Sequence, residues 1–155
     1  MQEEFMREAI KLAMEGMQKG EGGPFGAVIV KDHVIIGKGN NSVLRLNDPT
    51  AHAEVMAIRD ACRQLGSFQL TDCELYTSCE PCPMCLGAIY WARPQRFYYA
   101  CTRQDAANIN FDDAFIYDEL NLSLQDRSIP GIPLLANEGL KAFAVWAKLQ
   151  NKTLY

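Results

Sequence analysis

The sequence predicts a single α/β domain, residues 1–155, in which helices cover the faces of a largely parallel sheet. Runs rich in β-branched and aromatic residues alternate with apolar residues at helical spacing, and a strand, a helix and a strand follow one another near the middle of the chain. This order favours a second strand parallel to the first, with the helix on one face. At 155 residues and 48% hydrophobic content, the chain is long enough to bury the core of one domain.

The first third of the chain predicts a helix followed by an antiparallel hairpin. Apolar residues at helical spacing indicate the helix, namely Phe5, Ala9, Leu12, Ala13 and Met17. The segment KGEGG (19–23) ends this helix. Two β-branched runs follow, PFGAVIV (24–30) and VIIGKG (34–39), and only KDH (31–33) separates them. We therefore expect two strands joined by a tight turn.

A second helix is expected to begin at NDPT (47–50). Asp48 or Thr50 is the expected cap, with Pro49 in the first turn, and Gly66 ends the helix. Its expected apolar face consists of Val55, Ile58, Cys62 and Leu65.

The middle of the chain supplies the strand, helix and strand order. CELYTS (73–78) is typical of a buried strand. The prolines at 81 and 83 begin a third helix that runs through Ala92, and Pro94 prevents its continuation. RFYYAC (96–101) is the next strand.

The pattern is less regular after Cys101. The polar segment that follows is a candidate lid with a short helix at Asp112 to Glu119. IPLLA (132–136) predicts a last strand, GLKAFAVWAKLQ (139–150) predicts a last amphipathic helix, and NKTLY (151–155) is a tail.

Charge and terminal composition exclude several classes of partner. The net charge is −4 without a cluster of Lys and Arg, which gives little reason to bind a nucleic-acid backbone. The start MQEEFMREAI lacks the features of a signal peptide, and no apolar run approaches the length of a membrane span. We therefore expect a cytoplasmic protein with a small, uncharged substrate.

Six cysteines are too few for a disulfide scaffold in a chain of this length. Cys62, Cys73 and Cys101 lie in apolar stretches and are expected to fill the core. Cys82 and Cys85 differ, because they stand three positions apart at a predicted helix start, where the helix dipole favours thiolates. This pair fits a redox dithiol, a structural zinc clip or a catalytic metal site. The identity of a third metal ligand would distinguish these three possibilities.

Only two histidines are available as that ligand. His33 falls in the predicted hairpin turn, where a solvated polar residue is ordinary. His52 lies in PTAHAEV, at the start of the second helix, with Glu54 two positions later. Residues two apart on a helix point in different directions, so His52 and Glu54 converge only on something near the end of the helix, such as a metal ion.

His52, Cys82 and Cys85 would give a zinc ion three protein ligands and leave the fourth position to water. Cys79 is the one residue that could close that position, although it precedes the helix face that carries the other two cysteines. Zinc lowers the pKa of a bound water to about 7, and Glu54 could then carry its proton. His52-Ala53-Glu54 followed by Pro81-Cys82-Pro83-Met84-Cys85 matches the H-x-E and P-C-x-x-C signature of zinc deaminases.

From 22 to the last helix, the sequence resembles the cytidine deaminase superfamily and, within it, the bacterial guanine deaminases. The resemblance lies in GGPFGAVIVKD, NDPTAHAEV, YTSCEPCPMCLGAIYWARP, FDDAFIY and the terminal tyrosine. It implies a three-layer α/β/α sandwich around a five-stranded mixed sheet. It also implies zinc-dependent hydrolysis of guanine, a purine base, to xanthine and ammonia.

The resemblance also implies roles for individual residues. His52, Cys82 and Cys85 would hold zinc while Glu54 shuttles protons. Asp113 would grip the purine and assist proton transfer, with Asp112 as the competing choice. The backbone N–H of Ala53 would meet the purine carbonyl, and the rest of the base pocket would be Phe25, Asn41, Trp91 and Tyr155. In this family the C-terminal segment, roughly 120–155 here, is exchanged within a homodimer, so that Tyr155 acts either in its own chain or in the partner.

Alternatives remain open at the level of sequence. Phe25 and Trp91 also fit packing roles, Asn41 fits a turn, and Asp113 fits a helix cap. A tRNA adenosine deaminase would share the zinc core, but the acidic charge disfavours an anionic substrate. Deamination of another amino-heterocycle, such as cytosine or a triazine, a zinc-stabilised binding module and a thioredoxin-like dithiol are the other candidates.

Overall fold

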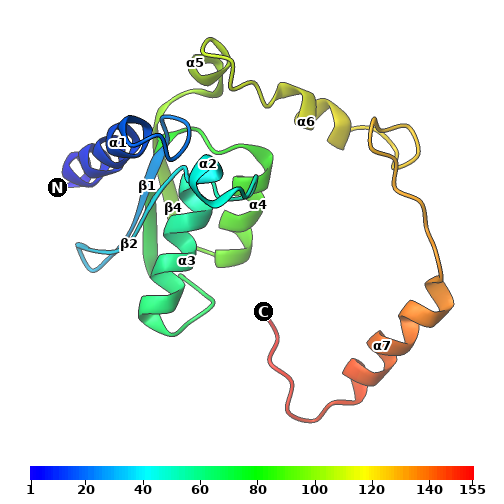
Figure 1. Cartoon of the computed structure of the whole chain (residues 1–155). Helices are drawn as coiled ribbons and strands as arrows, with labels where there is room; N and C mark the ends of the chain where they lie inside the picture. Colours follow the sequence, from blue (N-terminus) through cyan, green and yellow to red (C-terminus); the bar gives the residue numbers. More distant parts are fainter. The chain divides into compact units, whose positions relative to one another are not determined.

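The computed structural model describes residues 1–155, which divide into two compact units, 1–113 and 114–155. Figure 1 shows the elements of each unit, which are described separately below. The helices in both units are too short or too polar to cross a lipid bilayer.

A mixed four-stranded sheet forms the centre of unit 1. Its strands lie in the order β2 (Val34–Asn40), β1 (Gly26–Lys31), β3 (Cys73–Cys79) and β4 (Arg96–Cys101). β1 is antiparallel to both β2 and β3, and only the β3–β4 pair is parallel. The four strands predicted between 24 and 101 are therefore confirmed, but the largely parallel sheet is wrong, and so is the fifth strand. The direction of β1 relative to β3 depends on a long connection whose path no local pattern specifies.

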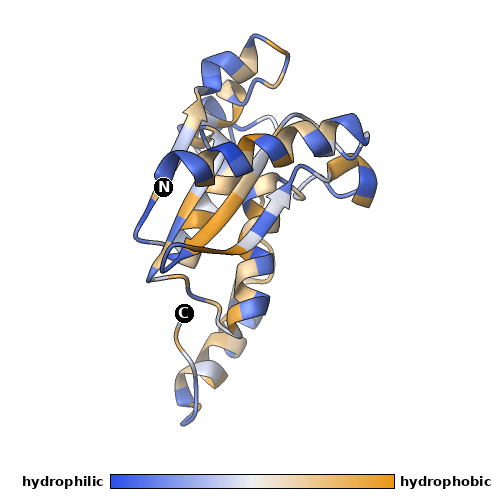
Figure 2. Cartoon of the chain, turned by 90° about the vertical axis from the view of Figure 1, so that its left-hand side faces the viewer, coloured by the Kyte–Doolittle hydropathy of each residue, from blue (hydrophilic) through white to orange (hydrophobic).

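Helix α1 (Gln2–Gln18) covers one face of this sheet. Val28, Val30 and Tyr76 point to this side, where Phe5 and Leu12 of α1 pack against them. The ring centroids of Phe5 and Tyr76 are 5.4 Å apart. In Figure 2, the hydrophobic middle of the sheet lies behind the largely hydrophilic outer surface of this helix. The first predicted helix is confirmed.

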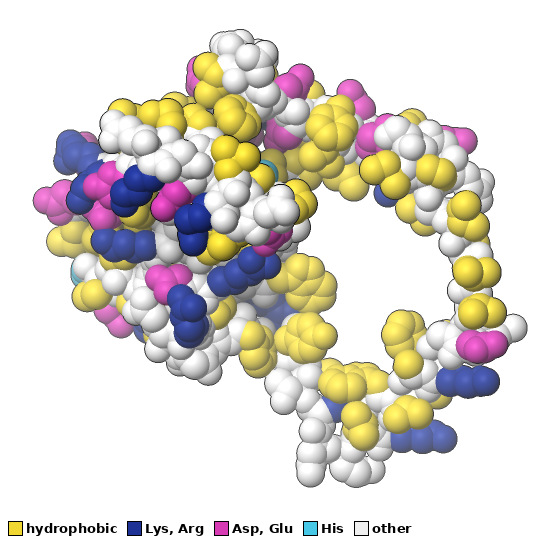
Figure 3. Space-filling view, in the orientation of Figure 1, with side chains coloured by type: hydrophobic (Ala, Val, Ile, Leu, Met, Phe, Trp, Pro, Cys, Tyr) yellow, Lys and Arg dark blue, Asp and Glu magenta, His cyan; other side chains and the backbone are white.

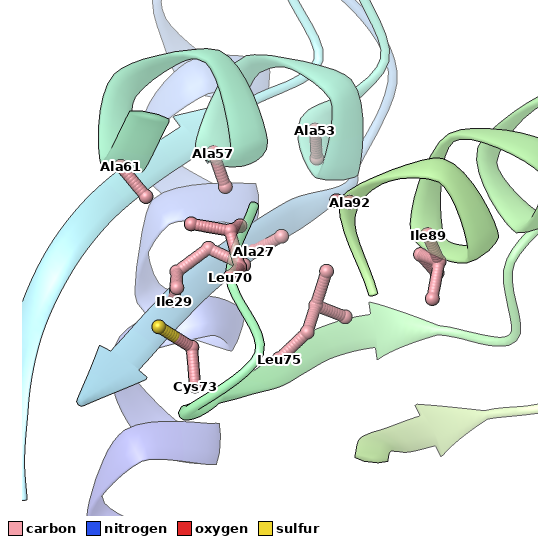
Figure 4. Packing of buried hydrophobic residues seen from close by; sticks show 10 residues of the cluster. All are labelled: Ala27, Ile29, Ala53, Ala57, Ala61, Leu70, Cys73, Leu75, Ile89 and Ala92. Atoms are coloured by element: carbon pink, nitrogen blue, oxygen red, sulfur yellow. The ribbon is translucent and has the colours of Figure 1, made fainter. Parts of the chain in front are cut away.

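Helices α3 (Ala53–Leu65) and α4 (Pro83–Ala92) cover the opposite face. Residues that alternate with the α1-facing ones, including Ala27, Ile29 and Leu75, point to this side, as expected for successive strand residues. Figure 4 shows them packed against three alanines of α3 and against Ile89 of α4. Unit 1 thus has helices on both faces of a mixed sheet.

The buried face of α3 differs from the predicted one. Ala53, Ala57 and Ala61 are fully buried, whereas Leu65 is exposed and the other predicted residues are only partly buried. The reason is close packing against two glycines of β2. A Cβ atom on Gly37 would lie 2.6 Å from the Ala57 carbonyl oxygen and 2.7 Å from the Ala61 Cβ. Small residues on both elements bring this helix against the sheet, and its larger side chains lie at the edges of the contact.

Local backbone conformation explains the hairpin turn. Asp32 and His33 have positive φ values of 48° and 64°, which suit the two-residue turn that joins β1 to β2. His33 is exposed there, as expected for a turn residue.

Cys101 is also exposed, so its predicted role in the core is wrong; it is the last residue of the edge strand β4.

Two short helices of unit 1 were not predicted. α2 (Val43–Leu46) follows β2 and ends at Asn47, which has a left-handed conformation. α5 (Arg103–Ala107) begins with a capping box in which Thr102 and Asp105 satisfy each other's backbone N–H groups. The spacing of these two residues is a sequence signal that could have located α5.

Unit 2 contains α6 (Ala114–Leu120) and α7 (Ala136–Lys148). The predicted short helix and last helix are confirmed, each with shifted boundaries, and 151–155 has no regular structure. The predicted strand at 132–136 is wrong, because 132–135 pairs with no strand and Ala136 already belongs to α7. An apolar run of this length becomes a strand only where a neighbouring edge accepts its backbone hydrogen bonds.

The close contact between β2 and α3 gives a test of the packing. Gly37→Ala should lower the free energy of unfolding by about 1–3 kcal/mol, because the added methyl group meets backbone atoms of α3. Gly87→Ala is the matched control: it lies in α4 with no atom within 4 Å of the new Cβ, and should raise stability by about 0.5–1 kcal/mol. Urea unfolding of both variants measures the difference. Equal stability for the two variants would contradict this packing.

Candidate active site

His52 immediately precedes helix α3 and occupies its N-cap position with an extended backbone (φ −72°, ψ 156°). The predicted cap at Asp48 or Thr50 is wrong. The Asp48 carboxylate instead accepts hydrogen bonds from the Thr50 backbone N–H at 2.8 Å and from its hydroxyl at 2.7 Å. These bonds lower the pKa of Asp48, the Thr50 hydroxyl contributing most, and they fold the loop that delivers His52.

Cys82 occupies the equivalent position on helix α4. It is the N-cap residue, also extended (φ −68°, ψ 168°), and Pro83 starts the helix. Cys85 lies in the first turn and is fully buried. Proline suits this position because its fixed φ fits the first turn and its missing N–H has no partner there in any helix. The prediction for this helix start is confirmed.

The structure brings the three predicted metal ligands together. The Nδ1 atom of His52 lies 3.6 Å from Sγ of Cys82 and 3.5 Å from Sγ of Cys85. The possible ligand atoms of the three residues all lie within 4.8 Å of one another. A tetrahedral zinc ion with ordinary bond lengths separates a nitrogen and a sulfur ligand by about 3.6 Å. The donor set and its spacing therefore fit zinc.

Cys79 does not belong to this group. Its buried thiol points to the end of β4, where Sγ lies 3.5 Å from the carbonyl oxygen of Thr102. Burial raises its pKa to about 12, which is unfavourable for a thiolate ligand. The cluster is therefore limited to three ligands, and the fourth ligand of a tetrahedral ion has to come from solvent or substrate.

The electrostatics of the cluster favour a cation. Hydrogen bonding by Cys85 and His52 lowers the pKa of Cys82 to about 4, despite its burial. The same contact with Cys82, together with burial, raises the pKa of Cys85, and the Cys82 thiolate raises the pKa of His52. The protons that these groups share are the ones a divalent cation replaces, since thiolate ligation requires deprotonated sulfur.

Glu54 lies one residue inside helix α3, with its side chain only 6% exposed. Its Oε2 atom accepts a hydrogen bond from the Cys85 thiol at 3.4 Å. Desolvation raises the pKa of Glu54 because burial disfavours the charged form. A carboxyl group in these surroundings can take up and release a proton beside the metal ligands without being one of them.

Three of the predicted pocket residues lie in unit 1 close to the start of α3. Asn41 is buried, and its backbone N–H donates to the carbonyl oxygen of Phe25 at 2.9 Å. Ala53 is the first residue of α3, where a backbone N–H has no partner within the helix. Phe25 contacts Phe111 edge to face, with ring centroids 5.0 Å apart. Phe111 was absent from the predicted pocket, although it opens the FDDAFIY stretch.

Asp113 is half-buried and Asp112 is exposed. Burial raises the pKa of Asp113, and the Cys82 thiolate raises it further. Asp113 stays the predicted second acid, with Asp112 as the alternative.

Trp91 and Tyr155 are not brought to the cluster by the fold of unit 1. Trp91 lies in the last turn of α4 and is 65% exposed. Nine residues of helix separate it from Cys82, which corresponds to roughly 13 Å along the axis. Tyr155 is the exposed last residue of unit 2. Their pocket roles stay predictions.

Comparison with known proteins defines the class first. Residues 1–101 match the cytidine and deoxycytidylate deaminase zinc-binding region. The chain therefore belongs to this family of zinc-dependent deaminases, and the cluster of His52, Cys82 and Cys85 is consistent with a zinc site.

Within the family, the similarity to one group of relatives extends over the whole chain. The sequence is 56% identical to the guanine deaminase of Bacillus subtilis strain 168, over 99% of this chain and 98% of that protein. The crystal structure of guanine deaminase from Bacillus subtilis aligns with a TM-score of 0.96 over 99% of this chain and 98% of its own. A tRNA-specific adenosine deaminase from Aquifex aeolicus strain VF5 is 46% identical, over 63% of this chain and 64% of that protein.

The ligand set predicts different effects for two buried cysteines. Cys85→Ala should reduce bound zinc more than about tenfold, because even loss of a residue behind the ligands often costs that much. Cys79→Ala should retain one zinc ion per chain, since its thiol faces Thr102. Metal analysis of both purified variants provides the measurement. Equal zinc loss from the two would show that Cys79 is a ligand.

Proposed function

We propose that the protein is a guanine deaminase that hydrolyses guanine to xanthine and ammonia. The observation that carries the proposal is a buried Glu54 beside a candidate metal site with only three protein ligands. The full-length similarity to guanine deaminase of Bacillus subtilis supports guanine as the substrate. A structural zinc site would need a fourth protein ligand and would not require the proton transfer that Glu54 can perform.

His52, Cys82 and Cys85 would hold the zinc ion, which when bound would supply an activated water for attack on the ring carbon that bears the amino group. Glu54 would accept the first proton of that water and deliver it to the ring nitrogen. It would then take the remaining proton of the added hydroxyl and pass it to the amino group, so that the C–N bond breaks, ammonia leaves and the carbonyl forms. Its buried position raises its pKa, which makes the protonated form accessible during the reaction. One carboxyl group thus serves as base and then as acid.

The proposed base pocket combines aromatic surfaces with hydrogen-bonding groups. Phe25 and Phe111 offer aromatic surfaces for the flat purine, and Asn41 offers an amide for its edge. The Ala53 N–H, which has no partner within α3, would donate to the purine carbonyl. Asp113 accepts from the ring N–H groups and assists proton transfer. Trp91 and Tyr155 complete the pocket.

A tRNA substrate is the second candidate, because tRNA-specific adenosine deaminases share the zinc-binding region. Their similarity covers only about two thirds of this chain, whereas that to guanine deaminase extends over 99% of it. Acidic and basic side chains are intermingled on the face of unit 1 seen in Figure 3. With a net charge of −4, the protein lacks the basic surface that an anticodon loop requires.

The active form is a homodimer in which the C-terminal segment, roughly 120–155, is exchanged. α7 supports this part of the proposal, since none of its residues is buried. Its large apolar side chains Leu140, Phe143, Val145 and Trp146 are all exposed, and Figure 3 shows apolar side chains along this helix. A helix of this length needs packing of its apolar face to be stable, and a second copy can provide it.

The protein functions in the cytoplasm in this proposal, because a reducing compartment suits its six unpaired cysteines.

Glu54→Gln tests the catalytic role. The variant should lose about 10²- to 10⁴-fold in kcat for guanine and keep its zinc. Glutamine preserves the shape of the side chain but cannot take up or release a proton as an acid or base. Ammonia release is measured with guanine, cytosine, a triazine and tRNA, together with the zinc content. Unchanged turnover in the zinc-loaded variant would refute the mechanism, and wild-type activity on tRNA but not guanine would favour the second candidate.

A mixing experiment tests the exchange of the C-terminus. Glu54→Gln and Tyr155→Ala chains are unfolded together, refolded and assayed, and each homodimer serves as a control. If Tyr155 acts in the partner subunit, mixed dimers contain one intact site, and activity should recover to about a quarter of wild type by statistical pairing. Activity equal to the average of the two homodimers would place Tyr155 in its own chain.

A further inference from the structure

Hydrogen bonds to neighbouring residues hold both the side chain and the backbone of Asn41 in place. Its side-chain Oδ1 accepts a hydrogen bond from the Val43 backbone N–H at 3.2 Å, which leaves Nδ2 as its donor toward a ligand. Its backbone carbonyl oxygen accepts from Nδ2 of Asn40 at 3.1 Å. The Asn40 side chain therefore holds the backbone of Asn41, from which the Asn41 side-chain amide extends.

Asn40 is in turn anchored by Glu21. The same Nδ2 atom of Asn40 donates to Oε2 of Glu21 at 2.7 Å. This hydrogen bond is charge-assisted and partly buried, which makes it stronger than a bond between neutral groups. Oε2 of Glu21 also lies 3.7 Å from Nε of Arg45. One carboxylate oxygen thus holds both Asn40 and the short helix that follows Asn41.

The backbone of the same turn adds to this anchor. The carbonyl oxygen of Glu21 accepts from the N–H groups of Leu44 and Arg45, each at 3.1 Å. Gly22 lies against Asn41 so closely that a Cβ atom would fall 2.6 Å from the Asn41 carbonyl oxygen and would also clash with Oδ1. The turn after α1 therefore packs against Asn41 and holds its backbone in place, and Glu21 is the charged residue of this turn.

We propose that Glu21 is a positioning residue for base recognition, which acts through Asn40 to hold the Asn41 amide toward the substrate. This inference rests on the proposed function. Glu21 touches neither zinc ligands nor Glu54 in the hydrogen bonds described, so its loss affects binding of the base more than the chemical step. An interaction that binds substrate and transition state equally alters KM and leaves kcat unchanged.

Steady-state kinetics with guanine test the proposal. Glu21→Ala should raise KM about tenfold at nearly unchanged kcat and zinc content. Glu21→Gln should rescue most of the effect, because its amide oxygen can still accept from Asn40. The matched control is Glu15→Ala, which removes a carboxylate of α1 that lies 3.8 Å from Lys11 and should leave KM unchanged.

A double-mutant cycle separates action through Asn41 from a general effect on structure. In an Asn41→Ala background, Glu21→Ala should cause no further rise in KM, since its target is already absent. A full additional rise, or a fall in kcat or zinc content instead of a rise in KM, overturns the proposal.

A second measurement does not depend on activity. The side-chain NH₂ resonances of Asn41 in the NMR spectrum should shift in Glu21→Ala and stay in place in Glu15→Ala. Failure of wild type to deaminate guanine would refute the proposed function alone, whereas an unmoved Asn41 signal would refute the role of Glu21 whatever the substrate.

Discussion

The site depends on the convergence of two helix N-termini on one face of the sheet. His52 and Cys82 are both N-cap residues with extended backbones, and their ligand atoms are 3.6 Å apart. Each helix N-terminus also carries a partial positive charge that favours thiolate. This convergence in turn needs α3 to lie close to β2, which the facing glycines and alanines allow. A stripe of small residues that begins beside His52, at Gly39 and Ala53, and continues along α3 thus determines where His52 lies.

The same arrangement explains how one carboxyl group can serve as base and acid. Glu54 is in the first turn of α3, so the helix dipole favours its charged form, whereas burial favours the neutral form. Burial is the larger effect and raises the pKa of Glu54. The carboxyl group lies next to the metal ligands because Glu54 follows His52 by two residues, and its Oε2 atom is 3.4 Å from Sγ of Cys85. Proximity to the cluster and readiness to hold a proton therefore have one structural origin.

Much of the fold could be predicted because its signals are local. Gly66 ends α3 and Pro83 begins α4 through backbone conformations that these residues favour, and both predictions are confirmed. One error is local, because Asp48 and Thr50 bond to each other and leave His52 as the cap of α3. The other errors concern long-range contacts. The antiparallel pairing of β1 with β3 and the exposure of Cys101 depend on which strands become neighbours, and the buried alanines of α3 depend on the glycines opposite. The predicted strand at 132–136 lacked a partner edge.

The candidate site shows the same division between local and long-range information. The H-x-E and P-C-x-x-C patterns identify the zinc ligands because coordination chemistry restricts both residue type and spacing. Phe111 and Glu21 belong to no such pattern, and only the folded chain places them beside Phe25 and Asn40. X-ray absorption spectroscopy at the zinc edge of the zinc-loaded protein tests the central claim most directly. The account predicts two sulfur donors and two lighter donors, of which one is imidazole, whereas a third sulfur donor would contradict it.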